Sequence, residues 1–143
     1  MDDVVKRILD TLRKDEVFLA ALATVDADGH PHVRFVRGRI DDDLTIRCPT
    51  FLGTGKVEQI RGHSRVALTC GDTDSSRPGT YLEIEGSAHI STDPADRLQA
   101  WGKRQEKWFS GPDDPSFAVV VIHPTLIEAL PIGGGPAPQV WRA

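Results

Sequence analysis

The sequence predicts a mainly β protein of the α+β type, an antiparallel barrel of six or seven strands with two or three flanking helices. Strand-like segments outnumber helical ones, and short turns join the first three strands, which favours an antiparallel meander. The 13 glycines and 10 prolines also indicate many turns. A doubly wound parallel sheet would need regular crossover helices, and their pattern is missing. At 143 residues, the chain fits one domain.

The first third of the chain predicts a short helix and the meander. Residues 2–15 place apolar side chains on one stripe, as an amphipathic helix does. The apolar run 17–25 indicates a buried strand, and Asp-Ala-Asp-Gly at 26–29 is a strong turn. A second strand then extends from 31 to 40, and a third short strand covers 44–48.

The middle of the chain combines a polar loop, a short helix and two strands. Loop 49–55 has threonine and glycine at its tip, and residues 56–60 have helical spacing. Residues 65–70 again indicate a strand. Residues 81–90 give the clearest alternation of apolar and polar side chains in the chain, so this strand has one buried and one wet face.

The last third predicts one long helix, more strand and a tail. Thr-Asp-Pro at 92–94 indicates a helix start, and we expect this helix to extend to about Trp108. An apolar central strand covers 117–122, and 124–130 continues the sheet. Residues 132–143 contain three consecutive glycines and are expected to form a loosely held C-terminal tail, so the barrel is assigned to residues 1–131.

The overall charge and the cysteines narrow the classes of function. A net charge of −4 and a pI of about 5.7 argue against nucleic-acid binding, which requires a basic face. The first 15 residues do not resemble a secretory signal, and no apolar run approaches the ~20 residues that span a bilayer. We therefore expect a soluble cytoplasmic protein. Cys48 and Cys70 are interpreted as buried free thiols, with a disulfide or redox pair as the less favoured alternative.

The strand at 31–40 carries three arginines, an unusual number for one strand. On a regular strand Arg34 shares a face with Val36, whereas Arg37 and Arg39 point to the opposite face. An arginine presents a planar fork of donors that matches two phosphate oxygens. A solvated arginine face explains this stretch equally simply when it is taken alone.

The loop that precedes the short helix at 56–60 is a second candidate for anion binding. Gly53 and Gly55 let the backbone approach a ligand, Thr54 offers a hydroxyl, and Lys56 adds a full charge at a helix N-terminus. The loop is not a Walker A motif, because Thr50 and Val57 stand where that pattern requires glycine and serine or threonine. A capped helix turn is the simpler alternative.

Taken together, these segments resemble the pyridoxamine-phosphate-oxidase-like family of FMN-binding split barrels. The likeness covers about residues 16–130 and includes Leu22–Pro31, Arg34-Phe35-Val36, Leu52–Lys56 and Val57–Ile60. In the second half, Gly86-Ser87-Ala88, the Trp108-Phe109 pair and Gly111–Pro115 are similar to the general stress protein branch of that family.

The resemblance implies a set of cofactor-binding residues. Arg34 and Lys56 would bind the flavin phosphate, and Thr54 would donate its hydroxyl to it. Val36 would lie beside the isoalloxazine ring, and Phe35 and Thr50 would offer contacts to it. Arg39 would contribute only if a bulge at Gly38 turned it toward Arg34. The remaining candidates are Gly55, which fills a position where the family usually has a basic residue, and Trp108.

The resemblance also implies a homodimer with an FMN at the subunit interface. Three functions remain open: an FMN-dependent oxidoreductase of unknown substrate, a flavin-binding or sensing stress protein with little turnover, and a deazaflavin-dependent reductase. The missing basic residue at Gly55 leaves FAD or deazaflavin as alternative ligands. Trp101 is expected to pack between helix and barrel. The five histidines have no metal-ligand spacing, and we expect no metal site.

Overall fold

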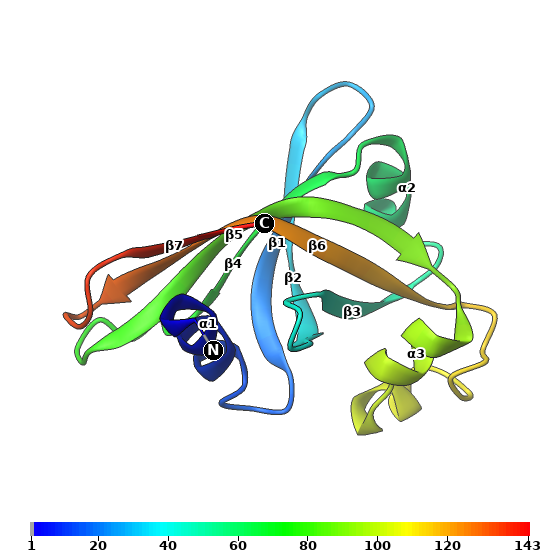
Figure 1. Ribbon diagram of the computed structural model, residues 1–143. Coiled ribbons are helices and arrows are strands. Elements are labelled where there is room, and N and C mark those ends of the chain that lie inside the picture. The colour runs from blue at the N-terminus through cyan, green and yellow to red at the C-terminus, as the bar shows by residue number, and fades with distance from the viewer. Residues whose placement is uncertain (1) are drawn as a thin grey trace.

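Seven antiparallel strands form one continuous sheet in the computed structural model, which describes residues 2–143 (Figure 1). The strands are β1 (Phe18–Val25), β2 (Pro31–Ile40), β3 (Ile46–Phe51), β4 (Arg65–Gly71), β5 (Gly79–Ser91), β6 (Phe117–Ile132) and β7 (Gln139–Arg142). Their order is β3-β2-β1-β4-β5-β6-β7, and β3 also pairs with β6. This second pairing closes six strands into a barrel and leaves β7 outside it. The predicted fold class is confirmed.

The turn between β1 and β2 sets a register without irregularities. Oδ1 of Asp26 accepts hydrogen bonds from the backbone N–H groups of Asp28 (2.9 Å) and His30 (3.0 Å), and Gly29 has a φ of +84°. The pairing then continues regularly from Val25 opposite Pro31 to Phe18 opposite Gly38. Gly38 therefore makes no bulge, and the condition for Arg39 to turn toward Arg34 is not met.

The barrel is split between β2 and β3. Only Arg39 opposite Arg47 and Ile40 opposite Ile46 pair these two strands. From Ile46 to Phe51, β3 instead follows β6. Residues 31–38 of β2 consequently have a hydrogen-bonded neighbour on one side only, namely β1, and the other edge borders an opening.

Three α-helices and one 3₁₀ helix cover the ends of the sheet. They are α1 (Asp3–Leu12), α2 (Gly55–Gly62), α3 (Pro94–Ala100) and η1 (Lys103–Lys107). Asp2 caps α1 by accepting a hydrogen bond from the backbone N–H of Val4 (2.9 Å). In Figure 1, α1 and α3 lie at opposite ends of the sheet, and α2 lies beside the end of the β1–β2 hairpin. No helix among residues 2–143 combines the length and apolar character needed to cross a bilayer.

The single helix predicted from 93 to about Trp108 is wrong. The α-helix ends at Ala100, and the extended backbone of Trp101 and Gly102 separates α3 from η1. The break lets the Trp101 ring pack against Phe117, with ring centroids 5.4 Å apart. Gly102 packs against the guanidinium of Arg39, which would have to move to admit a Cβ at that position.

The two strand segments predicted at 117–122 and 124–130 are one strand, β6. Pro124 is tolerated inside it because it borders a bulge in β6: Glu85 is opposite Leu126 and Gly86 is opposite Pro124, so Thr125 is the extra residue. The two backbones approach so closely that a Cβ on Gly86 would lie 2.5 Å from the carbonyl oxygen of His123. Glycine is required at this crossing by close approach of the backbones.

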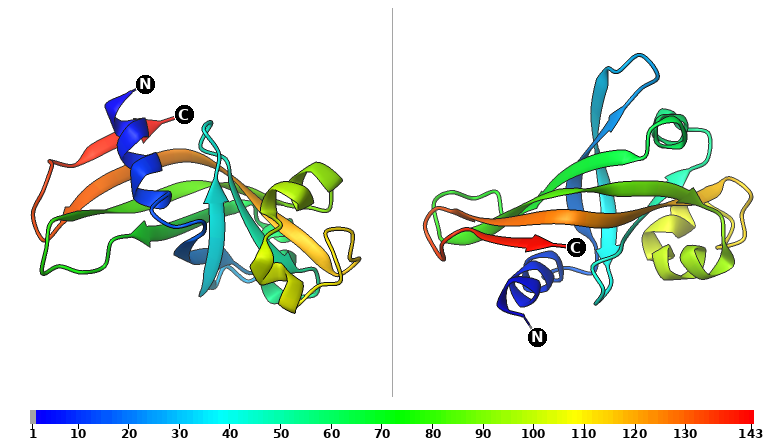
Figure 2. Two further views of the ribbon diagram at one scale, coloured as in Figure 1. Left: turned by 90° about the horizontal axis from the view of Figure 1, so that it is seen from below. Right: turned by 45° about the horizontal axis from the view of Figure 1, so that its top comes forward.

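The expectation of a loosely held tail is also wrong. Residues 139–142 form β7, which pairs with Leu126–Ala129 of β6. Arg7 of α1 fixes the same segment by donating to the carbonyl oxygen of Ala137 (2.8 Å) and to Oε1 of Gln139 (3.1 Å). Trp141 packs against the core. In both views of Figure 2, the two chain ends consequently lie on the same side of the molecule.

Candidate cofactor site

Arg34 is held in place by β1 and α2. One of its guanidinium nitrogens, Nη1, donates to the hydroxyl of Thr24 (2.7 Å) and to the carbonyl oxygen of Leu22 (3.2 Å), and Nη2 donates to Oε1 of Gln59 (2.8 Å). All of these acceptors are neutral. Burial lowers the pKa of Arg34 from its usual value, so the protein desolvates this cation without supplying a carboxylate for it.

Lys56 lies in the first turn of α2 and is half-buried. Its ammonium donates to the hydroxyl of Thr50 (2.9 Å) and, at 3.5 Å, to that of Thr54. Its pKa is lowered from the usual value, first by burial and then by the positive charge of Arg34. The charge of Arg34 on the strand is thus close enough to act on that of Lys56 at the loop.

The two threonine hydroxyls lie beside the ammonium. Thr50 is buried and its Oγ1 is 3.3 Å from Oγ1 of Thr54. Thr54 precedes α2 but does not cap it, and its hydroxyl donates to the carbonyl oxygen of Phe51 instead (3.0 Å). Gly55 has only ordinary van der Waals space around it, since a Cβ there would meet Nε2 of Gln59 at 3.7 Å. The position where the family usually has a basic residue is thus sterically open.

A groove of about 450 Å³ occupies the opening between β2 and β3. Three of its residues, Phe35, Val36 and Arg37, come from the unpaired edge of β2. The complete lining is Leu19, Phe35, Val36, Arg37, Pro49, Thr50, Phe51 and Lys56. Its two cations are Arg37 and Lys56, it contains no carboxylate, and Phe35 is 75% exposed. Arg34 does not line the groove and lies behind it, bonded to Thr24 and Gln59. An anionic ligand with an apolar ring system matches this lining.

Sequence reasoning missed four of the groove residues: Leu19, Arg37, Pro49 and Phe51. Arg37 belongs to the arginine-rich strand, but strand alternation assigned it to the face opposite Arg34. It lines the groove because the groove surrounds the free edge of β2, where side chains from both faces border the same space. Leu19 is opposite Arg37 on β1 and would have followed from the strand register.

Two predicted site residues lie apart from the cation pair. Arg39 donates to a carboxylate oxygen of Glu16 (3.1 Å) and packs against Gly102, so its guanidinium does not join Arg34. Trp108 is 65% exposed, and its ring meets that of Phe51 edge to face with centroids 6.5 Å apart. Trp108 therefore lies at the margin of the groove. Trp101 packs between Phe109 and Phe117 as expected.

The cysteines make no disulfide within residues 2–143. Cys48 and Cys70 are both buried, and burial raises the pKa of each thiol to about 12. A thiol with such a pKa is not a nucleophile at neutral pH. Redox chemistry in the groove consequently has no source in these two side chains.

Comparison with known proteins defines the class. A family model described as pyridoxamine 5'-phosphate oxidase matches residues 6–130. The chain belongs to this family, and its split barrel is consistent with it.

The similarity extends to the general stress protein branch. General stress protein 26 of Bacillus subtilis (strain 168) is 32% identical over 131 residues, which are 92% of this chain and 91% of that protein. The crystal structure of General Stress Protein 26 from Bacillus anthracis str. Sterne has a TM-score of 0.82 at 23% identity and covers 99% of this chain and 100% of its own. A heme binding protein from Mycobacterium smegmatis shares the fold, with a TM-score of 0.74 at 14% identity, and covers 99% of this chain and 59% of its own.

Proposed function

We propose that this chain binds FMN in the groove between β2 and β3, with the phosphate at Arg34, Lys56 and Thr50. One observation carries the proposal. Burial lowers the pKa of both Arg34 and Lys56, the charge of Arg34 lowers that of Lys56 further, and no carboxylate among residues 2–143 pairs with either side chain. A dianionic phosphate would remove their mutual repulsion and supply oxygens in place of water.

The rest of the groove suits the remainder of FMN. Val36 and Phe35 offer apolar surface for a flat ring, and the free edge of β2 offers backbone donors and acceptors along it. When bound, a flavin supplies hydride or electron transfer. The residues of the groove bind and orient the ligand. None of them is histidine, aspartate or glutamate, so the lining provides no general base of ordinary pKa.

We therefore infer an oxidoreductase of unknown substrate as the function, in the reducing cytoplasm that two unpaired buried thiols favour. A stress protein that binds or senses flavin with little turnover is the second candidate, because the groove lacks an evident acid or base. Reduction of the bound cofactor by a nicotinamide, followed by reoxidation with an added acceptor, separates the two. Sustained turnover supports the enzyme, and a single slow reduction supports the sensor.

Identification of the native ligand tests the proposal directly. The purified chain is expected to be yellow, and mass spectrometry of the released ligand should give the mass of FMN. If the purified protein is colourless and binds a deazaflavin, or if it carries FAD, the assignment of the cofactor changes and the groove remains the proposed binding site. A heme absorption band without flavin, or no uptake of added FMN, would overturn the proposal.

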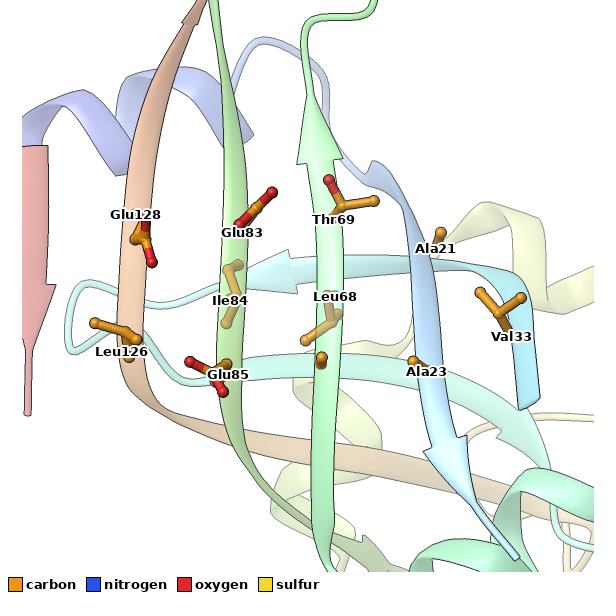
Figure 3. Close-up of a pocket in the computed structure, with 11 residues that line it drawn as sticks. Ala21, Ala23, Val33, Leu68, Thr69, Glu83, Ile84, Glu85, Leu126 and Glu128 are labelled. Atoms are coloured by element: carbon orange, nitrogen blue, oxygen red, sulfur yellow. The ribbon is translucent and has the colours of Figure 1, made fainter. Parts of the chain in front are cut away.

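We further propose that a second copy of the chain covers the exposed face beside this groove. Figure 3 shows the hollow of about 310 Å³ on this face, with Ala21, Ala23 and Val33 on one side and Glu83, Glu85 and Glu128 on the other. Phe35 extends this apolar surface along β2, because it is the next outward-facing residue after Val33 and lies opposite Ala21 of β1. Val33 and Phe35 are 69% and 75% exposed, a large apolar area for an unpartnered surface.

The charges on this face are self-complementary. Arg37 lies at the β2 end, and the glutamates lie at the β5 and β6 end. A two-fold axis through the hollow places the basic end of one copy against the acidic end of the other. Leu19 and Phe35 belong to both this face and the flavin groove, so the second copy would also cover the groove.

Charge reversal at the acidic end should weaken the dimer. For Glu83→Lys, we expect the dissociation constant of the dimer to rise at least roughly tenfold, because a lysine would face Arg37 of the second copy. Sedimentation at several protein concentrations measures this constant. Glu106→Lys on η1 is the matched control and should leave it unchanged. A monomeric parent protein at micromolar concentration, or equal effects of both variants, would contradict the proposed interface.

A further inference from the structure

We propose that the end of the β1–β2 hairpin is a binding site for one divalent transition-metal ion, with Asp26, His30 and His32 as ligands and Asp28 as a fourth donor. The sequence Asp-Ala-Asp-Gly-His-Pro-His places a ligand at every second position of residues 26–32. Sequence spacing alone predicts no metal site, because the five histidines have no metal-ligand spacing. The turn removes that objection by folding the segment back on itself.

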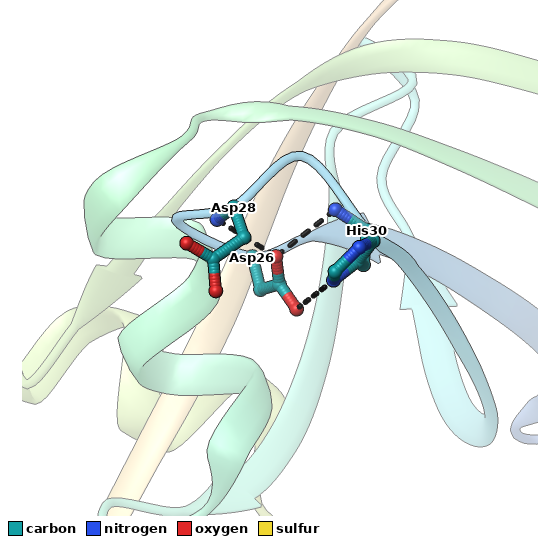
Figure 4. A group of neighbouring side chains, drawn as sticks. All are labelled: Asp26, Asp28 and His30. Carbon is teal, nitrogen blue, oxygen red and sulfur yellow. Dashed lines mark hydrogen bonds and ion pairs between the residues drawn. The ribbon is translucent and has the colours of Figure 1, made fainter.

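The ligand atoms converge on Asp26. Its Oδ2 is 2.7 Å from Nε2 of His32 and 3.7 Å from Nδ1 of His30. Figure 4 shows Asp28 on the other side of the same carboxylate, and the ligand atoms of Asp26, Asp28 and His30 all lie within 4.8 Å of one another. Ligands at about 2.1 Å from a metal ion are roughly 3.0–3.4 Å apart. The atoms of Asp26, Asp28 and His30 would therefore draw together around an ion, and Nε2 of His32 would exchange its 2.7 Å hydrogen bond to Asp26 for the ion.

The turn fixes the central carboxylate before any ion binds. Oδ1 of Asp26 already accepts the backbone N–H groups of Asp28 and His30, and Oδ2 is the oxygen that faces the two imidazoles. The strand pairing next to the turn holds the β-carbons of Asp26 and His32 in place. The side chain of Asp26 is 25% exposed and that of His30 is 75% exposed, which leaves an entry path and room for water ligands.

The donor types select the class of ion. Two imidazole nitrogens distinguish this cluster from an acidic turn, whose oxygens alone would suit Ca²⁺ or Mg²⁺. A mixed set of imidazole and carboxylate donors favours Zn²⁺, Ni²⁺, Co²⁺ or Cu²⁺. Two carboxylates also balance the charge of one divalent ion. Partial exposure indicates a site that exchanges its ion readily.

The test uses Zn²⁺ and the chain without any polyhistidine tag. Calorimetric titration should give one saturable site per chain. His30→Ala/His32→Ala should weaken it at least roughly tenfold. The matched control is His89→Ala/His123→Ala, which removes the same number of imidazoles from a stacked pair on β5 and β6, with ring centroids 5.6 Å apart. This control should bind Zn²⁺ as the parent chain does.

Asp28→Asn is a second variant, chosen because it removes a metal ligand without disturbing the fold. The Asp28 side chain makes no hydrogen bond to the turn, because the bond to Asp26 comes from its backbone N–H. This variant should keep the parent unfolding temperature and bind Zn²⁺ more weakly. Imidazole NMR signals of His30 and His32 should shift on titration, and those of His89 and His123 should not. Absence of a saturable site in the parent chain, or loss of binding only in the His89/His123 variant, overturns the proposal.

Discussion

Alanine at Arg34 or at Lys56 is expected to weaken FMN binding by roughly 10- to 150-fold in each case. Each substitution removes charge-assisted hydrogen bonds to the phosphate, and such bonds contribute about 1.5–3 kcal/mol. Quenching of flavin fluorescence during titration of the apoprotein measures the affinity. Arg34→Lys should fall between the parent and the alanine variant, because it keeps the charge and loses the planar fork of donors.

Arg39→Ala is the matched control for this experiment. Arg39 lies on the same strand as Arg34, but its guanidinium pairs with Glu16 and not with the groove. Its removal should leave the affinity for FMN within about twofold of the parent. Since Arg34→Ala also removes one hydrogen bond each from Thr24 and Gln59, the unfolding temperature of each variant has to be compared with that of the parent. Unchanged FMN affinity in both alanine variants would refute the phosphate site and leave the fold untouched.

The largest expected change in stability follows from Phe117→Ala. Phe117 is fully buried at the start of β6, and its ring contacts Phe109 and Trp101 with centroids 4.8 and 5.4 Å away. These rings form the second core cluster, which fixes the segment after α3 on the barrel. Truncation of a buried phenylalanine costs about 3–5 kcal/mol of unfolding free energy, and chemical denaturation measures it.

The comparison for this substitution is Leu98→Ala on α3. Leu98 is 64% exposed, so its truncation should change the unfolding free energy by less than about 0.5 kcal/mol. A loss below about 1 kcal/mol in Phe117→Ala would show that the aromatic cluster does not hold this segment.

The strands were predictable because their pattern is local. Alternation over 81–90 and the turn chemistry at 26–29 fixed both elements before any contact was known. The break after Ala100 was not predictable, because helical spacing continues through Trp101 while a distant contact with Phe117 decides its backbone. The tail was misjudged for a similar reason. Its glycines indicate flexibility, and the strand that follows them is stabilised by Arg7, far away in the sequence.

The candidate site was predicted in its charged part. Arg34 and Lys56 follow from residue type and from the resemblance to the family, and their role in binding a phosphate stays a prediction; the charge of Arg34 lowers the pKa of Lys56. Arg37 and Phe51 could not be assigned, because strand alternation describes a sheet with neighbours on both sides. Beside the split, residues from both faces of β2 border one groove. The hairpin cluster of Asp26, His30 and His32 was dismissed on sequence spacing alone, which ignores a chain reversal.

The weak link between β2 and β3 has a consequence for ligand exchange. Only two residue pairs join these strands. A small backbone rotation at Arg39 and Ile40 would therefore change the width of the groove between β2 and β3, while the pairing of β3 with β6 persists. A ligand can therefore enter and leave without any strand being peeled from its neighbour. For the proposed FMN we therefore expect exchange without global unfolding, with the barrel intact when the groove is empty.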